Sequence, residues 1–261
     1  MLCRPLLNNV IALLLLTTVA HAETPVEKGL AIATEADQRN RGFKDSEAQL
    51  TMTLKNAQGQ ESRRVLRIRI LENPSAGDKS LVVFDAPKDI SGTALLSYAN
   101  GIEPDDQWLF LPDVGRVKRI SGANRSGPFM SSEFAYEDMS APKIEKYTYQ
   151  YLRDEACGPL TCQVIERKPV YADSGYSREV IWLDREHLRP WKVDFYDRRN
   201  ELFKTLTYSG YKAYGKYWRA HQMVMTNVRT GKSTDLEFSG YRFGIGFNDG
   251  DFSQNALKRV R

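Results

Sequence analysis

Residues 115–139, GRVKRISGANRSGPFMSSEFAYEDM, combine side chains suited to two kinds of chemistry. The cations of this stretch are Arg116, Lys118, Arg119 and Arg125. Guanidinium and ammonium groups could pair with phosphate or with an anionic membrane surface. The apolar side chains that follow are Phe129, Met130, Phe134 and Met139. We expect residues 121–139 to form a lid over an apolar site, with the cations at its rim.

The lid hypothesis makes predictions about local structure. Ser131 or Ser132 would cap a short helix, and Glu137 and Asp138 would face solvent. Gly122, Gly127 and Pro128 would supply the hinge of the segment. The alternative is that the cations line the solvated side of a strand and the phenylalanines are permanently packed.

Patterns that would carry catalysis are weak. His187 and His221 each stand alone, and a lone histidine is more often structural than a general base. No Gly-x-Ser-x-Gly elbow and no phosphate-binding loop occurs in the sequence. The dense polar candidates are Glu145, Tyr147, Tyr149 and Tyr151, and tyrosines at alternate positions are typical of an ordinary strand face. We expect no enzyme activity, no cofactor and no metal.

Two cysteines, Cys157 and Cys162, are separated by a Gly-Pro turn in ACGPLTC. A disulfide across the tip of a hairpin is the expected arrangement in an oxidising compartment. A redox pair or a metal pair is the alternative, but a zinc site needs about four ligands and no second pair is nearby.

The first residues indicate export. Arg4 precedes a short apolar run at 10–19, and Ala20-His21-Ala22 is a typical cleavage site, so residues 1–22 read as a signal peptide. The early cysteine, Cys3, is not placed for lipid attachment. The formal net charge of +4, without a run of five basic residues, does not indicate nucleic-acid binding. Residues 23–261 lack a Pro/Ser-rich linker, and we expect a single domain.

The pattern of apolar residues predicts a mainly β fold. One amphipathic helix is expected first, with Val26, Leu30, Ala33 and Ala36 on its apolar side. After Gly42 the period changes to two, and about eleven short strands separated by turn residues follow. These features favour a single curled antiparallel sheet, a half-open barrel. The C-terminal FSQNALKRV reads as a short helical turn.

A barrel of this size encloses more volume than its own side chains fill. Large aromatic and flexible thioether side chains suit the wall of a cavity for an irregular apolar ligand. The predicted cavity residues are Leu50, Met52, Leu54, Leu66, Ile68, Ile70, Trp108, Phe110, Trp182, Phe195, Met223, Met225 and Phe238. The alternative for each is an ordinary core position.

The sequence resembles the LolA-like outer-membrane lipoprotein-sorting proteins, and most closely the branch that accompanies RND-type exporters. The resemblance lies in the signal peptide, the first helix, the Gly42-Phe43 turn and the block DQWLFLPDVGRVKRISGANRSGPFMSSEFAYEDM at 106–139. It runs to the C-terminal DFSQNALKRV. The chain departs from the best-known members in length and in its basic block, and the arginine contact that holds their lid matches no particular residue here.

The resemblance implies a half-open β-barrel closed by helices, with a hydrophobic cavity for acyl chains. It also implies a periplasmic carrier of a lipid or lipoprotein, passing its cargo between an RND-type inner-membrane transporter and an outer-membrane acceptor. Sealed barrel edges would favour a monomer. Two alternatives remain open: a periplasmic sensor that binds lipid or lipoprotein without transporting it, and a cofactor-free enzyme that uses the cavity.

Overall fold

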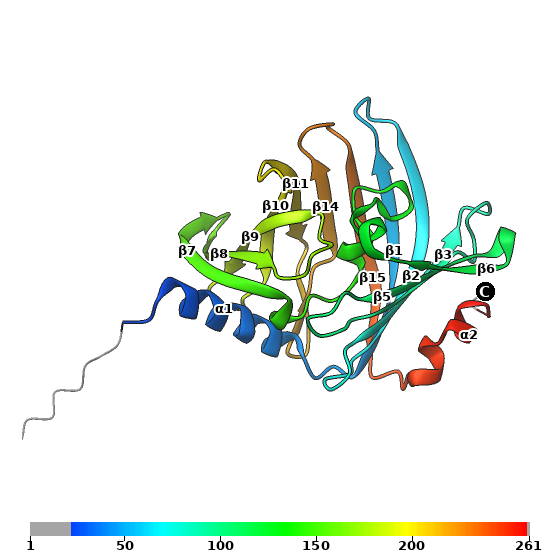
Figure 1. Cartoon of the computed structure of the whole chain (residues 1–261), viewed down its shortest axis with the longest axis horizontal. Helices are drawn as coiled ribbons and strands as arrows, with labels where there is room; N and C mark the ends of the chain where they lie inside the picture. The colour runs from blue at the N-terminus through cyan, green and yellow to red at the C-terminus, as the bar shows by residue number, and fades with distance from the viewer. Residues whose placement is uncertain (1–21, 260–261) are drawn as a thin grey trace, which may run out of the picture.

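The structure is a computed structural model that describes residues 22–259. The predicted signal peptide, apart from Ala22, lies outside the described residues. The described chain forms a large antiparallel sheet with two α-helices and several 3₁₀ turns (Figure 1). No helix within residues 22–259 is long and apolar enough to cross a membrane.

The main sheet has thirteen strands, where the sequence predicted about eleven. They are β1 (Asp45–Lys55), β2 (Glu61–Leu71), β3 (Lys79–Ala86), β4 (Ala94–Tyr98), β5 (Asp106–Leu111), β6 (Arg116–Ile120), β7 (Tyr147–Cys157), β8 (Leu160–Pro169), β9 (Tyr176–Asp184), β10 (Pro190–Asp197), β11 (Leu202–Ser209), β14 (Gln222–Asn227) and β15 (Ser233–Phe243). A separate hairpin is made by β12 (Lys212–Tyr214) and β13 (Tyr217–Arg219).

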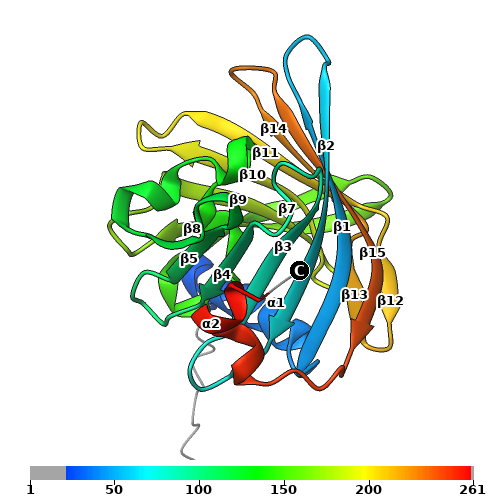
Figure 2. The same cartoon turned by 90° about the vertical axis from the view of Figure 1, so that its right-hand side faces the viewer.

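The sheet order is β6-β5-β4-β3-β2-β1-β15-β14-β11-β10-β9-β8-β7. Strand β1 therefore joins the early strands to the late ones, because it pairs with both β2 and β15. The edge strands β6 and β7 stand at opposite ends of this order, so the sheet is curled but not closed. Figure 2 shows β1–β3 in front of the strands β7–β11, with the interior between them.

The predicted period of two is confirmed in the first hairpin. Leu50 of β1 lies directly opposite Leu66 of β2, and both are buried. Arg67 and Arg69 alternate with these positions and pair with carboxylates on the other face, Arg69 with Glu47 at 2.6 Å. Successive side chains of a strand point to opposite faces, so the alternation assigns one apolar face to the interior.

Helix α1 (Pro25–Asn40) exists as predicted, and Ala33 and Ala36 of the predicted apolar stripe pack against the core. Val26 and Leu30 are exposed, whereas Gly29, Ile32 and Ala33 are buried. The helix packs on β7. A Cβ at Gly29 would lie only 2.6 Å from the backbone at Gln150, so the glycine allows backbone-to-backbone contact that a larger residue would prevent. The prediction of the helix's apolar side used hydrophobicity alone and did not consider this close backbone contact.

The C-terminal turn predicted from sequence comprises a 3₁₀ turn, Asp249–Phe252, and helix α2 (Gln254–Leu257). Phe252 and Leu257 are fully buried against the outer face of β3, β4 and β5. Figure 2 shows α2 lying beside β4. Strands β3 and β4 are therefore covered on both faces, which explains the unbroken apolar runs in SLVVF and ALL.

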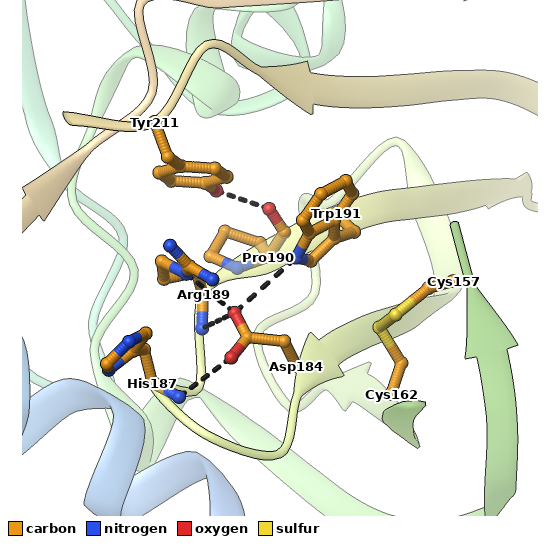
Figure 3. The surroundings of a disulfide bond; sticks show 8 residues. All are labelled: Cys157, Cys162, Asp184, His187, Arg189, Pro190, Trp191 and Tyr211. Carbon is orange, nitrogen blue, oxygen red and sulfur yellow. Dashed lines mark hydrogen bonds and ion pairs between the residues drawn. A yellow bond between two sulfur atoms is a disulfide. The ribbon is translucent and has the colours of Figure 1, made fainter. Parts of the chain in front are cut away.

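The disulfide between Cys157 and Cys162 is confirmed, with Cα atoms 5.8 Å apart at the tip of the β7–β8 hairpin (Figure 3). It belongs to a separate apolar cluster on the outer face with Val164, Val180 and Trp182. The neighbouring β9–β10 turn is fixed by Asp184. The carboxylate of Asp184 accepts hydrogen bonds from the backbone N–H of His187 at 2.7 Å and from Nε of Arg189 at 2.7 Å.

Candidate functional site

A cavity of about 320 Å³ lies inside the curl of the sheet. Seven predicted cavity residues line it: Leu50, Ile68, Ile70, Phe195, Met223, Met225 and Phe238. The predicted residues Met52, Leu54 and Leu66 belong to the same interior apolar cluster but lie outside the lining of this cavity. The wall combines aliphatic, aromatic and thioether groups, the composition typical of sites for apolar ligands.

Three predicted cavity residues are placed elsewhere. Trp108 and Phe110 face outward beneath α2, and Trp182 lies in the outer cluster beside the disulfide. Alternation along a strand separates two faces but does not say which of them is covered. Both sides of β5 and β9 are covered here, so an aromatic side chain on either side can be buried.

A second cavity of about 410 Å³ lies between α1 and strands β7–β10. Its apolar lining includes Ala33 and Ala36 of the helix and Ile165, Ile181 and Leu183 of the sheet. It abuts the first cavity, and the side chains bordering both are Ile70, Asp78, Ala141, Pro142, Arg167 and Tyr208. Each volume falls within the range of about 300–1,000 Å³ that holds small apolar ligands.

Segment 121–139 crosses the interior as a series of 3₁₀ turns, Gly122–Ser126, Phe129–Ser131 and Tyr136–Met139. The predicted short helix is therefore present only as 3₁₀ turns, and the prediction that Ser131 or Ser132 caps it is wrong, because the N-cap residues are Pro128 and Ala135. Phe134 and Met139 line the first cavity, and Met130 packs against the interior cluster. Phe129 is completely buried against Phe84, with ring centroids 5.8 Å apart.

The turn at Phe129–Ser131 is held by an arginine that the sequence analysis missed. Met130 and Ser131 have φ angles of +47° and +63°, the left-handed region that non-glycine residues rarely occupy. The guanidinium of Arg64 donates to the Met130 carbonyl oxygen. Arg64 is in phase with Leu66 and Ile68 on β2, and a cation on the inward apolar face is the sequence signal that could have identified it.

The four predicted rim cations do not gather at a cavity mouth. Arg116 and Lys118 are exposed on the edge strand β6 and line neither interior cavity. Arg119 pairs with Asp106 on the surface. Arg125 is buried; it donates to the Asp105 carbonyl oxygen at 2.9 Å and to the Asp173 carboxylate at 3.1 Å. Arg125 therefore anchors segment 121–139.

The interior also contains charged groups that the sequence analysis overlooked. Arg167 of β8 and Glu179 of β9 are directly opposite each other and form an ion pair at 2.5 Å. The guanidinium of Arg167 also lies over the ring of Tyr147, 4.3 Å from its centroid. Arg167 is in phase with Ile165, and Glu179 with Ile181, so both are polar positions in otherwise apolar inward patterns.

Glu137 and Asp138 were expected to face solvent, and this expectation is wrong. Glu137 borders the first cavity and also a small chamber of about 30 Å³ next to it. Asp138 borders the first cavity. Glu137 accepts hydrogen bonds from the Gly175 N–H at 2.8 Å and the Ser174 hydroxyl at 2.9 Å. Asp138 accepts from the Tyr176 hydroxyl at 3.0 Å.

Enclosure of these two carboxyls disfavours their charged forms. Burial, reinforced by the neighbouring negative charge of Asp138, raises the pKa of Glu137 to about 7. Burial also raises the pKa of Asp138 to about 6, although the nearby ammonium of Lys204 opposes this. The raised values follow from placing acidic side chains in an interior wall, where carboxylates are poorly solvated.

Both histidines contact neighbouring aromatic side chains. The ring of His187 packs on Trp218, with centroids 4.8 Å apart, and His221 bonds to the Tyr214 hydroxyl at 2.9 Å. Across residues 22–259, no group of three or more His, Cys, Asp or Glu side chains is placed to hold a metal ion.

Comparison with known proteins places this geometry in context. A family model described as an uncharacterized protein matches residues 76–259. A solved domain from Vibrio parahaemolyticus, named as a candidate outer membrane lipoprotein-sorting protein, is 52% identical, with a TM-score of 0.88 over 90% of this chain and 100% of that one. No curated protein matches the chain.

Two further solved structures share the fold. A DUF1329 family protein from Desulfovibrio piger is 29% identical, with a TM-score of 0.86 over 90% of this chain and 99% of that one. A LolA superfamily protein from Nitrosomonas europaea is 20% identical, with a TM-score of 0.71 over 87% of this chain and 98% of that one.

Proposed function

The chain belongs to the LolA-like family of outer-membrane lipoprotein-sorting proteins, and from this premise we propose that it is a periplasmic carrier for the acyl chains of a lipid or lipoprotein. The observation that carries the proposal is the apolar cavity inside the curled sheet, together with the second cavity that abuts it. The carrier binds its cargo without a catalytic reaction.

Burial of an acyl chain supplies enough free energy for binding. Removing one CH₂ group from water contributes roughly 0.8 kcal/mol, so a sixteen-carbon chain contributes on the order of 10 kcal/mol. The flexible side chains of Met223 and Met225 in the wall can adjust to chains of different shape. Burial of the acyl chain is therefore sufficient for tight binding, and release of the cargo requires a part of the protein that can move.

Segment 121–139 is the proposed gate. It contacts the strands on both sides of β1: Arg64 of β2 holds the Met130 carbonyl, and the Glu133 N–H donates to the Thr234 hydroxyl of β15 at 3.0 Å. Because Phe129 is fully buried, the whole segment does not swing out at low cost. Within this segment, the cavity wall from Phe134 to Met139 is the part proposed to yield, since an incoming acyl chain can replace the contacts of Phe134.

The partners are an RND-type inner-membrane transporter and an outer-membrane acceptor. This part of the proposal rests on the resemblance carried by the block at 106–139, including the exposed Arg116 and Lys118 of β6. Co-purification of the tagged protein with inner-membrane transporters from its own cells tests it. Recovery of the carrier without any such transporter would contradict the partnership.

Cargo binding is tested by native purification followed by extraction with organic solvent and lipid mass spectrometry. We expect stoichiometric acyl-chain lipid. A cavity-filling variant, Ile68→Trp, should lose most of the bound lipid, because Ile68 lines the first cavity. The matched control is Val65→Trp on the same strand, where the side chain is exposed on the other face. Equal lipid content in both variants would contradict binding in this cavity.

A further inference from the structure

Glu137 is an interior carboxylate without a cationic partner among residues 22–259. Its hydrogen-bond donors are all neutral: the Gly175 N–H, the Ser174 hydroxyl and the Tyr171 hydroxyl at 3.3 Å. Enclosing a negative charge without a counter-ion is costly, so this position favours an arriving positive charge.

Three of the neighbouring acidic groups are already paired with cations. Glu179 pairs with Arg167 at 2.5 Å, and Asp105 pairs with Lys146. Asp173 pairs with Arg125 at 3.1 Å. Asp138 forms no ion pair among residues 22–259, but the nearby charge of Lys204 partly offsets its negative charge. Glu137 has no such cation acting on it.

A second, independent group beside Glu137 also lacks a partner. Gln107 is completely buried, and its Oε1 accepts no hydrogen bond. The amide nitrogen of the same side chain donates to the Tyr136 carbonyl oxygen at 2.8 Å, which fixes the orientation of the amide. Gln107 and Glu137 line the same small chamber of about 30 Å³ next to the first cavity. An unsatisfied buried acceptor calls for an N–H or O–H donor.

Aromatic rings line the wall of the first cavity. They are Tyr147, Tyr171, Tyr176, Tyr208 and Phe195. The electron-rich faces of such rings attract cations, most strongly where water is excluded. Tyr147 and Tyr171 border the small chamber as well as the cavity, so the rings, the carboxylate of Glu137 and the orphan acceptor share one region.

We propose that this region binds the primary ammonium head group of an amphiphile whose acyl chain occupies the first cavity. The inference rests on the proposed function and narrows its ligand to amino-headed lipids, such as those that end in an ethanolamine group. An ammonium supplies the missing charge to Glu137 and an N–H donor to Gln107. A quaternary ammonium supplies only the charge, because it has no N–H.

An anionic head group fits the region poorly. The cations that line the first cavity or the small chamber are Lys79, Arg125, Lys146 and Arg167. Each is already paired with a carboxylate, of Asp249, Asp173, Asp105 and Glu179 respectively, and would have to exchange that carboxylate for another anion. Glu137 and Asp138 would then repel the newcomer. We therefore expect low affinity for fatty carboxylates, although the cavity can hold their acyl chains.

The test is displacement of the neutral apolar dye N-phenyl-1-naphthylamine from the delipidated protein by dodecyl amphiphiles that differ only in the head group. We expect dodecylamine to displace the dye at an about tenfold lower concentration than dodecanol does. This gain in affinity is typical of one charge-assisted contact. Dodecyltrimethylammonium should fall between them, and dodecanoate should be weakest. Glu137→Gln should abolish the advantage of the amine, whereas Glu237→Gln, at an exposed position of β15, should preserve it.

A second measurement needs no variant. Dodecylamine stays charged between about pH 6 and about pH 8, as lysine does, whereas Glu137 loses its proton over this range. Asp138 titrates just below it. The other acidic groups nearby, Glu179, Asp105 and Asp173, form ion pairs with Arg167, Lys146 and Arg125. The preference for amine over alcohol should therefore grow several-fold as the pH rises.

The outcomes separate the two ideas. Binding of all dodecyl compounds with equal affinity, or strongest binding of dodecanoate, would overturn the head-group inference while the acyl-chain carrier stands. An unchanged preference for the amine in Glu137→Gln would also overturn the head-group inference and leave the acyl-chain carrier standing. Failure of the protein to bind the dye and every dodecyl compound would overturn the carrier function itself.

Discussion

Replacing Glu137 by glutamine should change how the stability of the protein depends on pH. The two side chains have nearly the same shape. In the variant, the amide oxygen can still accept from the Gly175 N–H, and the amide nitrogen can donate to the hydroxyl oxygens of Ser174 and Tyr171. Glu137→Gln thus removes the charge while retaining the hydrogen bonds.

The magnitude follows from the raised pKa. Burial moves the pKa of Glu137 from its ordinary value of 4.5 to about 7, and each pH unit of displacement corresponds to about 1.4 kcal/mol. Between these values the folded protein holds a proton that the unfolded chain has released. The free energy of unfolding of the native protein therefore falls as pH rises through this window, by up to about 3 kcal/mol, and levels off above it.

The assay is chemical denaturation of the native protein and of Glu137→Gln from about pH 4 to about pH 8. Relative to the native protein, the variant should gain up to about 3 kcal/mol across the window, with most of the change between the two pKa values. Glu237→Gln at the exposed position should show a flat difference. A flat difference for Glu137→Gln as well would refute the claim that its carboxylate is enclosed without a counter-ion.

Three further changes test other parts of the structure. Gly29→Val should push α1 off β7 and lower the free energy of unfolding by about 1–3 kcal/mol, whereas Ala31→Val at an exposed helix position should not; equal melting temperatures would contradict the close contact. Arg64→Leu should speed amide hydrogen exchange in segment 121–139, because the Met130 carbonyl loses its donor. Arg63→Leu, at the exposed neighbouring position, is the control. Unchanged exchange in Arg64→Leu would contradict a role of Arg64 in holding this segment. The double change Cys157→Ser and Cys162→Ser should cost about 2 kcal/mol in thermal or chemical unfolding, since the closed loop is short, and should leave dye binding intact because the bond lies outside the cavity; a loss of binding would contradict that separation.

The sequence predicted the sheet and much of its interior wall because a strand shows its two faces in its alternation. Leu50, Ile68 and Phe238 were assigned to the cavity on this basis, and the structure places them there. Trp108 and Phe110 were misplaced because α2 covers the outer face of β5. That cover comes from the far end of the chain, and no local pattern reveals it.

The polar part of the site was missed for a different reason. Arg64, Arg167 and Glu179 each stand where an inward apolar residue is due, and the sequence analysis assigned none of them a role. Glu137 was assigned to solvent because an acidic pair is usually exposed. Its burial depends on segment 121–139 crossing the interior to reach Ser174 and Gly175, a long-range contact that spacing along the chain does not encode.

The position of β1 between β2 and β15 also bears on biogenesis. The first strand cannot complete its ladder until the last one has been delivered, some 190 residues later along the chain. Strands β1 to β6 can pair locally with their neighbours in sequence, but the pairing of β1 with β15 has a large sequence separation, and such non-local pairing forms slowly. Completion of the sheet therefore depends on the last strand of the chain.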